Sequence, residues 1–196
     1  GQRAQAQLVG LDLAQAGAQG DPLAQVEPGV AAAGRGPAAI PARAWPARQE
    51  RLAGARALMQ ANGIGSVLVE SGPSLDYYTG IQWWRSERLT GVVIPARGDP
   101  IVVTPFFERP SVAESLGIPA EIRVWQEDEE PLKLVADFLR ESRVASLPIA
   151  FDETDRFFLE ERLKRQLPSA QIVSANPVVR AQRMIKSPAE LALMQA

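Results

Sequence analysis

The side chains of this chain that could transfer protons or hold a metal ion are mainly carboxylates. The 196 residues include 23 aspartates and glutamates but no histidine and no cysteine. Histidine is the usual general base near neutral pH, and cysteine supplies thiolate nucleophiles and soft metal sites. Ser-His-Asp sites, Cys-His sites and typical zinc centres are therefore excluded within this chain. We expect no catalytic residue, metal ligand or bound cofactor here, so the chain should assist chemistry carried out on another stretch of protein.

Size and charge restrict the class of partner. A length of 196 residues predicts one domain with or without tails. The net charge of −2 argues against nucleic acid and anionic membrane surfaces as partners. No stretch approaches the roughly 20 apolar residues that span a bilayer. Location stays open between the cytoplasm and export, because the chain lacks cysteine and begins with Gly1, which is compatible with a removed leader or a residue left by cloning.

The first part of the chain differs in composition from the rest. Residues 1–44 are rich in alanine, glutamine, glycine and proline, and no aromatic residue precedes Trp45. Such a segment buries too little apolar surface to offset the entropy lost on ordering. We expect a flexible arm over residues 1–44. The alternative is a short helix over residues 4–19 that docks on a partner.

Hydrophobic patterns after residue 45 predict alternating helices and strands. Pro46 can open a helix that ends at Asn62-Gly63, and the turn residues at 95–100 predict an antiparallel hairpin. The expected strands cover residues 66–70, 89–94, 101–104, 121–125, 148–151 and 171–174. Further helices are expected over residues 108–116, 131–142, 154–166 and 177–184. We therefore predict an α/β fold with a mixed sheet of about six strands and helices on both faces.

Capping signals mark several helix starts. The acidic run at residues 127–130 precedes Pro131, where negative charge favours a helix start, so we interpret it as helix stabilisation rather than a cation site. Thr154 is the expected cap of the next helix. Ser187-Pro188-Ala189-Glu190 forms a capping box for a final helix. Because the sequence stops soon after this box, we expect the chain to be part of a longer protein.

Two short motifs carry a resemblance to a known family. Residues 75–80 (L-D-Y-Y-T-G) precede a strand, and residues 183–190 read R-M-I-K-S-P-A-E. Together with the helix that ends at residues 62–64, they resemble the amino-terminal domain of the creatinase/prolidase/aminopeptidase P family. The resemblance extends over about residues 46–196. It implies a family domain over 45–184, with 185–196 starting the linker helix into a catalytic domain outside this chain.

The resemblance also implies a parent enzyme. Family peptidases cleave the bond before proline and use a pita-bread domain that holds two divalent metal ions, often manganese. The metal ligands there are aspartates, glutamates and a histidine, and none is assigned to this chain. By resemblance, this chain is the non-catalytic domain of a metal-dependent Xaa-Pro peptidase that acts on proline-containing peptides as a homodimer. A creatinase-like amidinohydrolase parent and a stand-alone protein-binding module remain the alternatives.

In several family members, the segment that corresponds to residues 81–88 reaches the active site of the neighbouring subunit. Arg88 aligns with an arginine that holds the substrate carboxylate, and a guanidinium suits that task because its planar fork grips a carboxylate at two points. Arg85 is a second candidate. The alternative for Arg88 is a surface ion pair with Glu87 or another acid.

The same segment contains two adjacent tryptophans, which by resemblance could stack on a proline ring or line the pocket. Side chains of neighbouring residues in an extended segment point to opposite sides, so Trp83 and Trp84 cannot both face the same core. We expect one of them to be exposed, although ordinary packing is the alternative for each. Tyr77 and Tyr78 are expected to be packing residues, and Asp76 to cap a local turn.

Overall fold

A computed structural model describes residues 44–195 of the chain, with side chains from residue 47 onward except Leu193. The arm expected over residues 1–44, and its alternative helix over 4–19, lie outside the described residues apart from Ala44. That residue begins helix α1 (Ala44–Ala61), which corresponds to the helix expected from Pro46.

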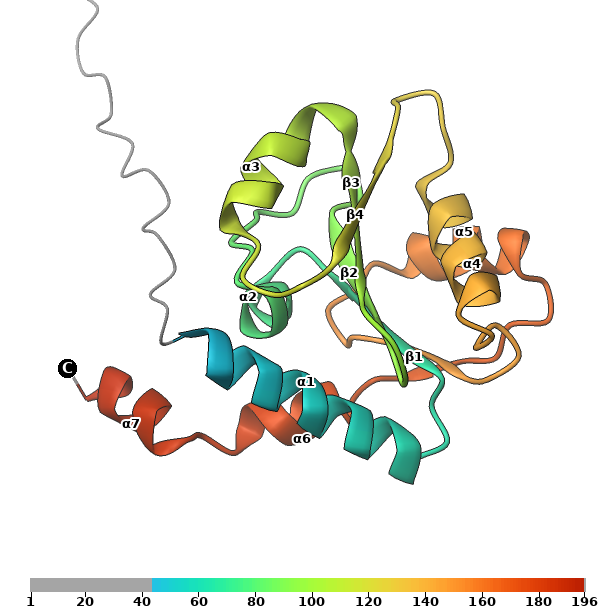
Figure 1. Ribbon diagram of the computed structural model, residues 1–196. Coiled ribbons are helices and arrows are strands. Elements are labelled where there is room, and N and C mark those ends of the chain that lie inside the picture. The colour runs from blue at the N-terminus through green and yellow to red at the C-terminus, as the bar shows by residue number, and fades with distance from the viewer. Residues whose placement is uncertain (1–43, 196) are drawn as a thin grey trace, which may run out of the picture. The chain divides into compact units, whose positions relative to one another are not determined.

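A six-stranded mixed sheet forms the centre of the described region (Figure 1). Its order is β4-β3-β2-β1-β5-β6, and only β2 runs antiparallel to its neighbours. The strands are β1 (Ser66–Glu70), β2 (Gly91–Pro95), β3 (Ile101–Pro105), β4 (Glu121–Trp125), β5 (Ile149–Phe151) and β6 (Ile172–Ser174). The predicted mixed sheet and the predicted β2–β3 hairpin are confirmed.

Helices cover both faces of this sheet, as predicted (Figure 1). Alternation along β1 separates the faces, because Val67 and Val69 pack in one core and Leu68 in the other. The first core includes residues of α1, α2 and α6, and the second includes residues of α4 and α5. These helices are α2 (Pro73–Thr79), α3 (Arg109–Ser115), α4 (Pro131–Glu141), α5 (Phe157–Gln166), α6 (Val179–Met184) and α7 (Pro188–Met194).

Strand direction brings distant segments to one edge of the sheet. Glu70 at the end of β1 lies opposite Gly91 at the start of β2. The other five strands run parallel to one another, so they all end at this edge, which we call the carboxyl edge. Loops at the carboxyl ends of strands are the usual place for functional groups in open α/β sheets.

Several local expectations were wrong. Residues 73–79 form helix α2, where no helix was expected; Pro73 occupies its first turn and Gly80 is its C-cap. Strand β2 begins at Gly91 rather than residue 89, and the Leu89 carbonyl accepts a hydrogen bond from Trp125 Nε1 instead of a strand partner.

Thr154 does not cap α5, contrary to expectation. The helix begins at Phe157, and Arg156 at its cap position makes no side-chain capping bond. The Thr154 hydroxyl instead donates to Asp152 Oδ2 at 2.9 Å, within a turn closed by the bond from Asp155 N to Asp152 O. The Thr154 hydroxyl is therefore bound within the turn that follows β5 and is not available to cap α5.

Candidate functional site

Residues 81–88, predicted to carry the site, connect α2 to β2 at the carboxyl edge. The segment starts after Gly80, whose φ of +83° lies in the left-handed region, and a Cβ there would come within 2.8 Å of Arg48 Cζ. Glycine is therefore required at this turn. Ile81 and Leu89, which bracket the segment, are both buried, whereas most side chains between them are at least partly exposed. The segment is thus a loop with buried ends and an accessible middle.

The two tryptophans of this segment face different surroundings, as expected. Trp84 is 93% exposed, whereas Trp83 is partly buried against the first core. Both line a cavity of about 310 Å³ together with Gly72, Pro73, Asp76 and Gln82. Asp76 faces this cavity and accepts a bond of 3.4 Å from Gln82 Nε2, so it does not cap a turn. The cavity combines aromatic surface with one carboxylate.

The guanidinium of Arg88 is engaged by two exposed acids. Its Nε and Nη2 lie 3.1 and 2.5 Å from Glu127 Oε1, and Nη1 pairs with Glu87. The guanidinium also lies over the Phe107 ring, with 5.3 Å between Cζ and the ring centroid. The hydrogen bonds to Glu127 are the main reason that the pKa of Arg88 is raised. The surface ion pair considered for Arg88 is therefore present, with a second acid from the loop before α4.

The acidic run at residues 127–130 has a divided role. Glu130 caps α4 by accepting a bond of 3.0 Å from Leu132 N, which agrees with the helix-start interpretation. Glu127 instead faces Arg88. Only part of the run therefore stabilises the helix start.

Arg85 contacts a different acid from Arg88. Its Nε lies 3.4 Å from Glu70 Oε2, and its Nη2 donates to the Ser71 carbonyl at 3.2 Å. Arg85 and Arg88 thus leave the same segment but bind different strand ends of the carboxyl edge, Arg85 at the end of β1 and Arg88 in the loop after β4. Both sequence-predicted arginines lie on one loop with the exposed Trp84, yet within residues 44–195 neither guanidinium stacks on an indole ring.

Sequence reasoning missed two residues beneath this loop, Glu70 and Arg156. The Glu70 side chain is fully buried at the end of β1 and accepts bonds from Arg156 Nε at 2.8 Å and Arg156 N at 3.3 Å. Arg156 Nη2 also donates to the Arg88 carbonyl at 3.4 Å. The available signal was an acidic residue that closes an apolar strand just before Gly72-Pro73, which places a charge at the carboxyl edge.

Asp155 joins the same cluster through backbone bonds. Its Oδ1 accepts from Glu70 N at 2.9 Å and its Oδ2 from Asp152 N at 3.0 Å, so it ties the ends of β1 and β5 together. Burial raises the pKa of Asp155 to about 7, and the nearby carboxylates of Asp152 and Glu70 add to the rise. This carboxyl group is therefore able to change its charge near neutral pH.

The two tyrosines of the first motif contact residues of α1 and α6. The Tyr78 hydroxyl donates to Gln182 Oε1 at 2.7 Å, and Gln182 Nε2 donates to the Arg51 carbonyl at 3.0 Å. Arg51 Nη1 donates to the Tyr77 carbonyl at 2.8 Å, and its guanidinium lies 4.1 Å from the Tyr77 ring centroid. Burial raises the pKa of Tyr78. Both tyrosines are packing residues, as predicted.

Residues 183–190 are held against α1 and α2. Arg183 Nη1 donates to Ser74 Oγ at 2.8 Å, and Arg51 Nη2 pairs with Glu190 Oε1 at 2.8 Å. Ser187 and Glu190 form the predicted capping box of α7. Arg51 connects the two motifs that carry the family resemblance, because it donates to the Tyr77 carbonyl and pairs with Glu190, although about a hundred residues separate the motifs.

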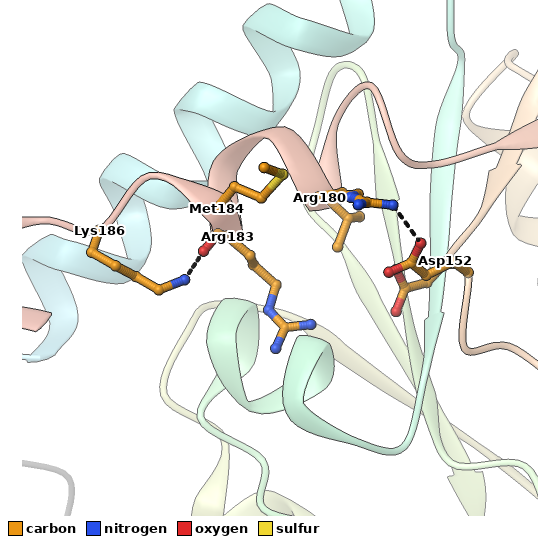
Figure 2. A pocket seen from close by; sticks show the side chains of 7 residues that line it. Asp152, Arg180, Arg183, Met184 and Lys186 are labelled. Carbon is orange, nitrogen blue, oxygen red and sulfur yellow. Dashed lines mark hydrogen bonds and ion pairs between the residues drawn. The ribbon is translucent and has the colours of Figure 1, made fainter. Parts of the chain in front are cut away.

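A groove of about 310 Å³ lies where α6 faces the end of β5 (Figure 2). Its charged side chains largely contact nearby groups, because Arg180 pairs with Glu153 at 3.6 Å and Lys186 donates to the Arg183 carbonyl. The remaining lining residues are Asp152, Val179 and Met184. The groove offers mixed charge rather than one ligand set.

The metal implied by the family resemblance does not fit residues 44–195. Within that range no three histidine, cysteine, aspartate or glutamate side chains are grouped so as to hold a metal ion. Among the described helices, none combines the length and apolar character needed to cross a membrane.

Comparison with known proteins identifies the family of this chain. The model of the Creatinase/Prolidase N-terminal domain family matches residues 51–185. The chain is 30% identical over 148 residues to Probable dipeptidase PepE of Mycobacterium tuberculosis, an alignment that covers 72% of this chain and 37% of that protein. The chain thus spans little more than a third of the length of the curated relatives it matches.

Solved structures agree with this assignment. Dipeptidase PepE from Mycobacterium ulcerans is 28% identical with a TM-score of 0.66, over 76% of this chain and 39% of that one. The creatinase/prolidase N-terminal domain of an X-Pro dipeptidase from Streptococcus pyogenes has a TM-score of 0.58, over 67% of this chain and 98% of that one. Because that domain is only 15% identical in sequence, the similarity shows a shared fold and nothing about function. On the match over residues 51–185, this chain belongs to the creatinase/prolidase N-terminal domain family.

Proposed function

We propose that this chain is the non-catalytic amino-terminal domain of a metal-dependent Xaa-Pro peptidase of prolidase or aminopeptidase P type. In this role it supports a homodimer and contributes residues 81–88 to the substrate pocket of the neighbouring subunit. The observation that carries the proposal is Trp84, which is 93% exposed on a loop with buried ends. The names of the relatives, which include dipeptidases and a prolidase, support the peptidase class.

The loop offers the chemistry that a proline-containing peptide needs. Trp84 presents a large apolar ring surface for a pyrrolidine ring, and Trp83 lines the adjacent cavity. Arg88 offers a charged fork for a carboxylate, with Arg85 as the second cation. Bond cleavage would then depend on divalent metal, manganese-like and dinuclear, held outside this chain.

Arg88 must exchange partners to act in this way. Its present partners are exposed, with 75% of the Glu87 side chain and 65% of the Glu127 side chain accessible to water. Exposed ion pairs contribute little free energy, at most about 1 kcal/mol. A substrate carboxylate held in a drier pocket between two subunits can therefore displace them.

Self-association measured by sedimentation velocity tests the dimer. We expect concentration-dependent association of the chain, weakened about tenfold or more by Trp84→Ala, since a buried tryptophan anchor contributes more than about 1.4 kcal/mol to an interface. Leu147→Ala is the matched control, because Leu147 is a 43% exposed apolar residue at the opposite edge of the sheet, and it should leave association unchanged. Association that Trp84→Ala does not alter would contradict the proposal.

A proline-dipeptide assay with added manganese tests the non-catalytic role. We expect no turnover by the pure chain, because it lacks a histidine and residues 44–195 contain no metal-binding group. Turnover that copurifies with the chain through successive columns would contradict the assignment.

A further inference from the structure

We infer that Glu70 is a positioning residue for the 81–88 loop. The inference deepens the proposed function, on which its link to substrate and dimer rests. Glu70 ends β1, its side chain is fully buried, and its two carboxylate oxygens serve two different arginines. Oε1 accepts from Arg156 Nε at 2.8 Å, whereas Oε2 lies 3.4 Å from Arg85 Nε and also accepts from Arg156 N at 3.3 Å.

These contacts reach two points of the loop. Arg85 is bound through its side chain, while Arg88 is bound through its carbonyl by Arg156 Nη2 at 3.4 Å. At the other end of the loop, Ile81 N donates to Thr79 Oγ1 at 3.0 Å and the Ile81 side chain is buried. Trp84 therefore lies between two restrained points of the loop. Ile81 is held before it, and Arg85 and Arg88 are held after it by Glu70 and Arg156.

Burial explains why this contact restrains the loop. A carboxylate removed from water is unfavourable unless cations and hydrogen-bond donors surround it. Arg156 alone satisfies Oε1 and part of Oε2, and Arg85 supplies the remaining cation. Movement of the loop away from the sheet would leave the buried charge less well compensated. The conformation that presents Trp84 and Arg88 is thereby favoured before any partner binds, which lowers the ordering cost of association.

A simpler role for Glu70 is to join β1 to the turn before α5 through Arg156 alone. The two roles differ at Arg85, because only positioning of the loop requires that contact. Arg85→Leu removes the contact and leaves the Glu70–Arg156 pair in place. Arg85→Lys keeps a cation at the same position.

Limited proteolysis and hydrogen exchange of the full 196-residue chain test the inference. Glu70→Gln should accelerate trypsin cleavage after Arg88 at least tenfold and raise amide exchange across residues 81–88. The matched control is Glu121→Gln, which removes a carboxylate that lies 2.9 Å from Arg123 Nε on β4. That variant should leave cleavage after Arg88 unchanged.

If Glu70→Gln does not fold, Arg85→Leu provides the deciding measurement. It should raise exchange over residues 81–88 as Glu70→Gln does, and Arg85→Lys should restore most of the protection. The inference is wrong if folded Arg85→Leu exchanges like the wild type over these residues. It is also wrong if Glu70→Gln accelerates exchange equally throughout the chain.

These outcomes are separable from failure of the proposed function. If Glu70→Gln frees the loop while Trp84→Ala leaves self-association unchanged, the positioning role stands and the dimer proposal fails. If Trp84→Ala weakens association but the loop is equally protected in both Glu70→Gln and wild type, the positioning role fails alone.

Discussion

The two motif-bearing regions of this molecule use polar side chains in different ways. In the corner formed by α1, α2 and α6, which we call the linker corner, Tyr78, Gln182 and Arg51 bind one another in partly buried contacts. In the 81–88 loop, Trp84 is 93% exposed and Arg88 pairs with exposed acids. The linker corner therefore maintains the fold, whereas the loop keeps groups available to a partner.

The contrast shows that recognisable motif residues need not be ligand-binding residues. The tyrosine motif and residues 183–190 carry the family resemblance, and Arg51 connects them through the Tyr77 carbonyl and Glu190. The residues proposed to meet substrate follow the tyrosine motif on a loop whose contacts are mostly exposed. Mutations in the two regions should accordingly affect different properties, and three experiments test that difference.

The largest expected effect is on the free energy of unfolding. Tyr78→Ala should lower it by about 3–5 kcal/mol, because it empties a core position and leaves Gln182 Oε1 without its hydrogen-bond donor. Trp84→Ala should change it by less than about 0.5 kcal/mol, since Trp84 is almost fully exposed. Urea denaturation measures both. A loss for Trp84→Ala as large as that for Tyr78→Ala would identify Trp84 as a packing residue and remove the contrast.

The second effect concerns pH and the cluster below the loop. The pKa of Asp155 is about 7 in the folded chain and has an ordinary value of 3.8, so between these values the folded state binds more protons than the unfolded state. Stability should therefore fall as the pH rises from about 4 to 7, by more than about 1 kcal/mol, and then level off.

Asp155→Asn should flatten that pH dependence, because the amide does not titrate. The control is Asp99→Asn at an exposed turn, which should keep the wild-type slope. Urea denaturation at several pH values measures the slopes. If Asp155→Asn and wild type lose stability equally between pH 4 and 7, burial of Asp155 does not control this behaviour.

The smallest expected effect is local to the linker corner. Glu190→Ala removes the reciprocal capping bond to Ser187 and the ion pair with Arg51, so α7 should fray. We expect a loss of about 0.5–1 kcal/mol, confined to α7 and read by hydrogen exchange of residues 187–195. Exposed Glu161→Ala on α5 serves as the control. Faster exchange over residues 81–88 in Glu190→Ala would mean that the linker corner and the loop are coupled.

Much of the fold was predictable because its signals are local. Alternating or continuous β-branched runs marked the strands, and the Ser187–Glu190 spacing alone marked a helix start. Adjacent positions also implied that Trp83 and Trp84 could not share one core, although not which of them would be exposed. Predictions failed where a neighbouring residue overrode a local signal. Thr154 was expected to cap α5, but its hydroxyl donates to Asp152 instead.

The candidate site was less predictable because its contacts join remote segments. Arg88 meets Glu127 across 39 positions of sequence, and Glu70 meets Arg156 across 86. No periodicity or motif relates such pairs, since their proximity depends on the strand order and the direction of each strand. The sequence alone determined the residue types, the α/β pattern and the absence of histidine and cysteine chemistry. Only the tertiary structure decided which charges share the carboxyl edge, because pairing of distant strands, rather than local spacing, brings them together.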